Sequence, residues 1–96
     1  MDGVSLTLYI AGRTPRSERA IANLRRLGEK FLGGSYELLV IDAAEEPDAA
    51  EADRILATPT LIKTSPPPLR RITGDLSDPH RVLTGLQIQY DLPHPE

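Results

Sequence analysis

A strand–helix–strand pattern across residues 4–41 is the feature of the sequence that most limits its fold. Residues 4–10 alternate between apolar and polar side chains, the period of two that is typical of a β-strand. Residues 36–41 are almost continuously apolar, which predicts a strand covered on both faces. Two strands joined by one helix form a βαβ unit, so we expect parallel strands with a right-handed crossover.

The helix between these strands has signals at both ends. Thr14 stands directly before Pro15, which favours a helix start because threonine caps the first turn and proline fits its first position. One apolar stripe follows, made of Ala20, Ile21, Leu24, Leu27 and Phe31. Gly33 and Gly34 then predict the helix end, because glycine readily adopts a left-handed conformation.

The second half of the chain predicts shorter elements. Residues 45–56 are acidic and rich in alanine, which predicts a short helix, and residues 57–63 predict a loop that enters a strand. Three prolines at 66–68 interrupt that strand, and residues 69–73 predict another short one. Ser77-Asp78-Pro79 predicts the start of a further helix.

Residues 82–92 carry two conflicting hydrophobic patterns. Read as a helix, residues 82–86 place their apolar side chains on one face. Read as a strand, residues 86–92 alternate between apolar and polar. The conflict indicates either a helix that runs into a strand or tail, or a segment built for two folds. The tail at about 91–96 is predicted to be disordered.

The composition narrows the class of function. The 96 residues fit one domain, residues 1–96, and the net charge of −3 argues against nucleic acid. The chain has no cysteine, which excludes disulfide exchange and thiolate metal ligands. The longest unbroken apolar run, residues 38–41, is too short to span a membrane. The acidic start at Asp2 is unlike a signal peptide, so we expect a cytoplasmic protein.

No motif predicts a cofactor, a metal site or catalysis. Asp75, Ser77, Asp78 and His80 include the groups of a catalytic triad, but adjacent residues at a helix start seldom converge on a cleft. Capping by Ser77 or Asp78 explains them better, and a small enzyme that uses Ser77 or His80 is kept as an alternative. The two histidines are too far apart in the sequence to suggest a metal site. The acidic residues at 45–53 are those of a solvated helix start.

Arginine side chains gather around the first predicted helix, and they admit two interpretations. They either form a solvated face that Glu18 and Glu29 offset, or they bind an acidic protein partner. Arg70 and Arg71, beside the three prolines, admit the same two interpretations. The residues predicted to bind a partner are Arg16, Arg19, Arg26, Lys63, Arg70 and Arg71.

Thr58-Pro59-Thr60, after a short helix and before an apolar strand, resembles the cis-proline loop of thioredoxin-like domains. A wider resemblance covers about residues 4–90 and points to the KaiB family of circadian-clock proteins. The segments that carry it are Leu8-Tyr9-Ile10-Ala11-Gly12-x-Thr14-Pro15, Val40-Ile41-Asp42, Ile55-Leu56-Ala57-Thr58-Pro59-Thr60-Leu61, Pro66-Pro67-Pro68-x-Arg70-Arg71-Ile72-x-Gly74-Asp75-Leu76-Ser77 and Val82-Leu83-x-Gly85-Leu86.

The resemblance implies an α/β protein that exchanges between a thioredoxin-like fold, ordered βαβαββα, and a ground-state fold, ordered βαββααβ, in a homodimer or homotetramer. It implies a non-enzymatic timing role: binding a KaiC-type ATPase, promoting its dephosphorylation and displacing a histidine kinase with a KaiB-like domain. KaiA is a partner only in organisms that have it. The alternative is a stand-alone, stress-related thioredoxin-like adaptor that never changes fold.

Family residues implicated in the fold change correspond to Pro66, Pro67, Pro68, Gly85, Leu86 and Gln87. Arg19 matches a basic residue of the family that faces a partner, and replacement of the family glycine at Gly85 favours the thioredoxin-like state. The chain departs from many family members at Gln87, where they carry an acid, and at Leu39, where they often carry a lysine.

Overall fold

A four-stranded sheet organises residues 3–88, the part of the chain that the computed structural model describes. The elements follow one another as β1 (Val4–Ile10), α1 (Pro15–Phe31), β2 (Tyr36–Asp42), α2 (Pro47–Ala52), β3 (Thr60–Ser65), β4 (Arg70–Thr73) and α3 (Pro79–Gly85). The strand order is β2-β1-β3-β4, with β1 and β2 parallel and the other two pairs antiparallel. The βαβαββα order and the parallel pairing of the first two strands are therefore confirmed.

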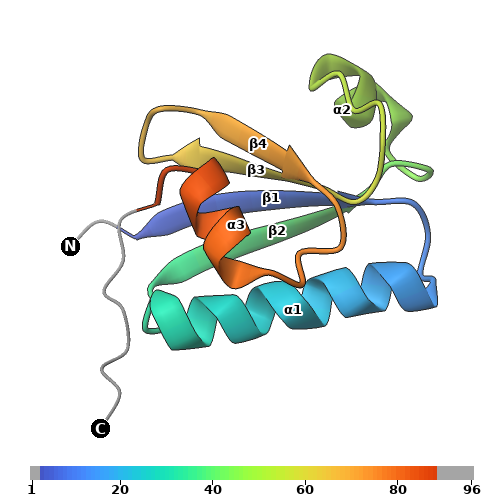
Figure 1. Cartoon of the computed structure of the whole chain (residues 1–96). Coiled ribbons are helices and arrows are strands. Elements are labelled where there is room, and N and C mark those ends of the chain that lie inside the picture. Colours follow the sequence, from blue (N-terminus) through green and yellow to red (C-terminus); the bar gives the residue numbers. More distant parts are fainter. Residues whose placement is uncertain (1–2, 89–96) are drawn as a thin grey trace, which may run out of the picture.

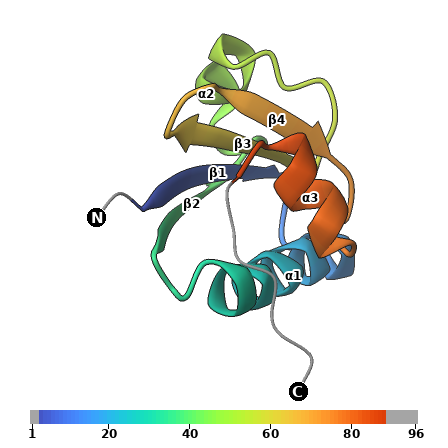
Figure 2. The same ribbon diagram turned by 60° about the vertical axis from the view of Figure 1, so that its left-hand side comes forward.

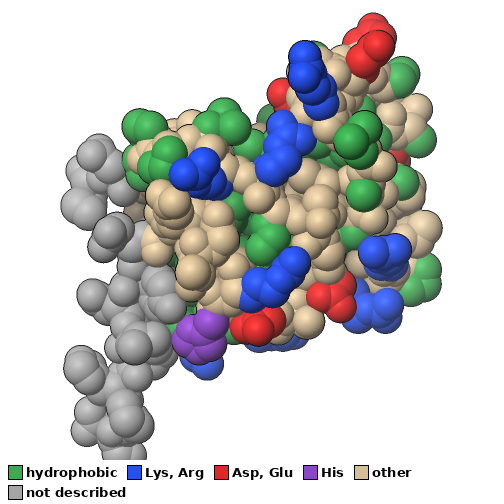
Figure 3. All heavy atoms as spheres, turned by 45° about the horizontal axis from the view of Figure 1, so that its top comes forward, with side chains coloured by type: hydrophobic (Ala, Val, Ile, Leu, Met, Phe, Trp, Pro, Cys, Tyr) green, Lys and Arg blue, Asp and Glu red, His purple; other side chains and the backbone are tan. Residues whose placement is uncertain are grey.

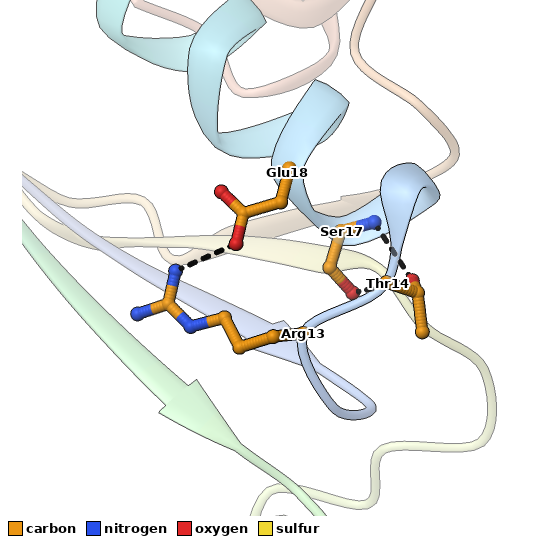
Figure 4. Close-up of polar contacts among 4 residues, drawn as sticks. All are labelled: Arg13, Thr14, Ser17 and Glu18. Carbon is orange, nitrogen blue, oxygen red and sulfur yellow. Dashed lines mark hydrogen bonds and ion pairs between the residues drawn. The ribbon is translucent and has the colours of Figure 1, made fainter.

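The predicted helix start and end of α1 are both present. Thr14 is the N-cap, and its Oγ1 accepts a hydrogen bond of 3.1 Å from the Ser17 amide (Figure 4). At the other end the helix stops at Phe31, and Gly33 and Gly34 have φ values of 59° and 75°. These left-handed values explain why glycine occupies both positions.

The hydrophobic core lies between one face of the sheet and helices α1 and α3, which lie together on that face (Figures 1 and 2). Leu8 of β1, Leu24 of α1, Leu61 of β3 and Leu83 of α3 are each 0% exposed. Helix α2 lies on the other side of the sheet, over one end of it, and contributes no buried side chain.

The prediction that residues 36–41 are covered on both faces is wrong. Strand β2 is an edge of the sheet, and its Leu39 is 58% exposed. Leu38 and Val40 pack against the core, as alternation in a strand with one covered face requires. The six-residue α2 is also shorter than the helix predicted over 45–56, and it is too short to cover β2.

Helix α3 follows the helical interpretation of residues 82–86. Asp78 caps it, with Oδ1 accepting from the amides of His80 at 3.1 Å and Arg81 at 3.3 Å. The helix ends at Gly85, and Leu86 is buried in the core. The strand interpretation relied largely on residues beyond 88, and these, like the predicted disordered tail, lie outside the described residues.

Candidate partner-binding surface

Three of the predicted partner-binding residues share one side of α1. Arg16, Arg19 and Arg26 are exposed, and steps of three and seven residues bring them to the same side of a helix. Lys30, four residues further on, extends the row. We call these four residues the α1 basic stripe.

The charges of the α1 basic stripe are not neutralised by ion pairs within residues 3–88. The ion pair found in this part of the chain joins Arg13 Nη1 to Glu18 Oε2 at 3.3 Å, at the start of α1 (Figure 4). Both side chains are more than half exposed, so the pair contributes about 0–1 kcal/mol. The idea that acidic neighbours offset the arginine charge therefore holds for Arg13 and does not extend along the helix.

A hollow of about 90 Å³ lies beside the stripe, between α1 and the segment that leads into α3. Arg26 and Lys30 stand at its rim, and Leu27, Phe31 and Leu76 supply its apolar lining. Pockets that hold small-molecule ligands usually measure about 300–1,000 Å³. The hollow is therefore of a size to receive one side chain of a protein partner.

The remaining basic residues of the predicted set lie apart from the stripe. Arg70 pairs with Lys63 across β3 and β4, and Arg71 pairs with Ile62, so successive residues point to opposite faces. Arg71 donates from Nη1 to the Arg54 carbonyl at 3.3 Å, on the side of α2. Lysine and arginine side chains are accordingly spread over the face seen in Figure 3 and form no single patch there.

Lys63 requires a correction. It was predicted at the partner-binding surface, but its side chain is 1% exposed and offers nothing to a partner in this fold. The reason is strand alternation, which places Lys63 on the same face as Leu61 and so beneath α3.

The two proline loops lie at opposite ends of β3. The Thr58–Pro59, Ser65–Pro66 and Pro67–Pro68 peptide bonds are cis. Pro59 and Thr60 are buried, and the Pro59 carbonyl accepts from the Gly74 amide at 3.2 Å, which ties this loop to the end of β4. Pro66 to Pro68 form the exposed connection between β3 and β4.

The carboxylates near Ser77 and His80 serve as turn and cap groups. Asp75 Oδ1 accepts from the Ser77 amide at 3.1 Å, and hydrogen bonds from Ser77 lower the pKa of Asp75, with a smaller effect of Arg19. Asp78 is occupied as the cap of α3. The His80 ring packs edge-on against Phe31, with ring centroids 5.7 Å apart. Across residues 3–88 no group of three or more His, Asp or Glu side chains is placed to hold a metal ion.

Tyr9 makes a buried polar contact that no local pattern in the sequence predicts. Its ring is 1% exposed, and its hydroxyl donates to Asp53 Oδ2 at 2.6 Å and lies 3.2 Å from the Ala49 carbonyl oxygen. These bonds attach α2 to the sheet. Burial, followed by the hydrogen bond to Asp53 and the charge of that carboxylate, raises the pKa of Tyr9 from 10.0 to about 12.

We expect the phenol of Tyr9 to ionise well above the ordinary tyrosine pKa of 10.0, near pH 12. A raised pKa stabilises the folded protein below pH 10, and this stabilisation is lost as the pH rises toward about 12. Ultraviolet absorbance of tyrosinate measures the titration. The part of the absorbance change that is lost in Tyr9→Phe belongs to Tyr9. Asp53→Asn should lower the pKa of Tyr9. An unchanged titration in that variant would exclude the contact.

Comparison with known proteins agrees with the resemblance seen in the sequence. A family model described as the KaiB domain matches residues 7–88. A circadian clock oscillator protein KaiB of Prochlorococcus marinus (strain MIT 9313) is 58% identical over 86 residues, which cover 90% of this chain and 72% of the relative. The chain belongs to the KaiB family. A further KaiB, from Gloeothece citriformis, is 54% identical over 90% of this chain and 81% of its own length.

Solved structures place the KaiB-family chain in the thioredoxin-like fold. The N-terminal domain of Synechococcus elongatus SasA matches with a TM-score of 0.75 at 24% identity, covering 96% of this chain and 90% of that one. Mitochondrial thioredoxin 3 of Saccharomyces cerevisiae matches with a TM-score of 0.69 at 18% identity, covering 91% and 79%. KaiB is a family of circadian clock regulators and not of known enzymes. Within residues 3–88 no helix has the length and apolar character needed to cross a bilayer.

Proposed function

We propose that this KaiB-family chain is a non-enzymatic clock component that binds a KaiC-type ATPase and promotes its dephosphorylation. Family membership supports the clock role. The observation that carries the binding proposal is the α1 basic stripe, whose exposed cations lie beside a hollow of about 90 Å³. Such a surface suits an acidic segment of a protein partner, because complementary charge steers encounter and sets the register of binding.

The proposal includes a second fold and further partners. We propose that the thioredoxin-like arrangement exchanges with the βαββααβ ground state of a homodimer or homotetramer, and that the ATPase selects the former. The two hydrophobic patterns of residues 82–92 support this exchange. Competition with a histidine kinase that has a KaiB-like domain follows from the same docking, as does recruitment of KaiA where the organism has it.

Charge reversal of the α1 basic stripe tests the binding surface. The variant Arg16→Glu, Arg19→Glu, Arg26→Glu should lose capture by the KaiC-type ATPase of the source cell, measured by pulldown and by native size measurement. Arg25→Glu is the matched control, because Arg25 is exposed on the same helix outside the stripe. Circular dichroism checks that both variants fold. Full capture by the triple variant would contradict the proposed surface.

Gly85→Ala separates the proposal from a stand-alone thioredoxin-like adaptor that never changes fold. Gly85 is the last residue of α3 and is exposed, and alanine is favoured over glycine in a helix by about 1 kcal/mol. A gain of that size shifts a two-state equilibrium about fivefold toward the thioredoxin-like fold. Capture by the ATPase should therefore accelerate by about the same factor. An adaptor with one fold would show almost no change.

A further inference from the structure

Lys63 is the one charged side chain that is buried within residues 3–88, at 1% exposure. Lysine is almost never fully buried unless an acid is paired with it. Here strand alternation forces the burial: Lys63 pairs with Leu6 of β1, both side chains face the core, and the ammonium reaches the end of α3.

The surroundings of this ammonium compensate little of its charge. Its Nζ donates to the Gln87 carbonyl at 3.2 Å, and within residues 3–88 no carboxylate lies within ion-pair distance. The charged group that acts on it is Arg70, its neighbour across β3 and β4, which has the same sign. Both the removal from water and the repulsion by Arg70 lower the pKa of Lys63, and the removal from water has the larger effect.

The accepting carbonyl belongs to a residue that is itself in an unfavourable conformation. Gln87 has a φ of 55°, in the left-handed region where a helix end usually has glycine. The Gln87 amide donates to Thr84 at 3.1 Å and the Ile88 amide to Leu83 at 2.9 Å, which closes α3 in a Schellman motif. A buried cation and a left-handed glutamine therefore meet at one helix end.

We propose that Lys63 is a built-in destabiliser of this fold, whose buried, acid-free ammonium weakens the end of α3 and makes residues 86–88 a segment that opens readily. The opposite role, a stabilising cap, has a basis too, because a cation near a helix C-terminus is favourable. If this favourable interaction with the helix end were the larger effect, the pKa of Lys63 would be raised. Burial and the charge of Arg70 lower it instead.

The inference concerns the isolated chain and does not depend on binding of an ATPase. Joined to the proposed function, it identifies a residue that keeps the thioredoxin-like fold from dominating before a partner arrives. The tests below use the full chain alone, so their failure leaves the proposed function standing, and failure of ATPase binding leaves this inference standing.

Replacement of each lysine in turn gives a matched pair of variants, because the chain contains only Lys30 and Lys63. Lys30 is exposed, with its Nζ 5.5 Å from the centre of the Phe31 ring. Amide hydrogen exchange of Gln87 and Ile88, followed by NMR at neutral pH, reports opening of the α3 end. Lys63→Met should raise the protection of these amides severalfold, and Lys30→Met should leave it unchanged. Unchanged or reduced protection in Lys63→Met would overturn the proposal.

The pH dependence gives a second readout, which the wild-type chain supplies even if Lys63→Met does not fold. A lowered pKa in the folded state means that the unfolded chain binds more protons just below pH 10.5, so stability rises with pH in that window. This rise in stability should disappear in Lys63→Met and persist in Lys30→Met. Tyr9 has the opposite effect on stability, but it is present in both variants, so its contribution cancels in the comparison. In the wild type, side-chain NMR should show Lys63 titrating below the ordinary lysine pKa of 10.5. Titration of Lys63 at or above that value would overturn the proposal.

Discussion

Leu83→Ala is expected to lower the free energy of unfolding by about 2–5 kcal/mol, the range for removal of a buried leucine side chain. Leu83 is 0% exposed and lies in α3, a helix of seven residues that cannot be stable by itself. Its attachment to the sheet depends on buried apolar side chains, of which Leu83 is central. Urea denaturation followed by circular dichroism measures the change.

Thr84→Ala is the control for this prediction, because Thr84 is the next residue of the same helix and is exposed. A change within about 0.5 kcal/mol is expected there. A domain of this size is only about 5–15 kcal/mol more stable than its unfolded chain, so Leu83→Ala should leave a substantial unfolded fraction. A loss below about 1 kcal/mol would show that α3 does not pack on the sheet as described.

Gly28→Ala should destabilise the fold by about 1–3 kcal/mol, even though alanine is the better helix former. A Cβ at Gly28 would lie 2.8 Å from Cδ1 of Tyr36 and closer still to Cε1 and Cζ of the same ring. Gly28 is buried in the last turn of α1, so the clash can be relieved only by moving Tyr36 or the helix. Urea denaturation again gives the measurement.

Two comparisons make the Gly28 prediction specific. Gly85→Ala, also in a helix, should stabilise by up to about 1 kcal/mol, because its Cβ would meet only the terminal Cδ1 of Ile72, at 3.2 Å. In a Tyr36→Ala background the clash is gone, and Gly28→Ala should become neutral or favourable. Equal stability changes for Gly28→Ala in both backgrounds would contradict contact between these residues.

The elements best predicted from the sequence are those whose signals are local. Three such signals involve neighbouring residues, and each predicted the structure correctly. They are the alternation in β1, the Thr14–Pro15 cap and the apolar stripe of α1. The cover of β2 could not be predicted in the same way. Whether the second face of an apolar strand is covered depends on distant elements that pack against it, and α2 proved too short to cover Leu39.

The candidate surface was predicted in part, and the errors have a physical cause. Exposure of Arg16, Arg19 and Arg26 follows from their place outside the apolar stripe of α1. Lys63 was assigned to the surface from its charge, although its position two residues after Leu61 in a strand predicts the inner face. The contact of Tyr9 with Asp53 joins residues 44 apart in sequence, and no local pattern indicates it.

The attachment of α2 has a consequence for how such chains diversify. Helix α2 contributes no buried side chain to the core, and hydrogen bonds at Tyr9 and Arg71 help to tie its segment to the sheet. The exposed residues 44–48 can thus change in composition at little thermodynamic cost, whereas Asp53 is held by its hydrogen bond with the buried Tyr9. That freedom makes the segment a place where related chains can acquire new specificity while the rest of the architecture is kept. It is also a place where a reporter group can be inserted.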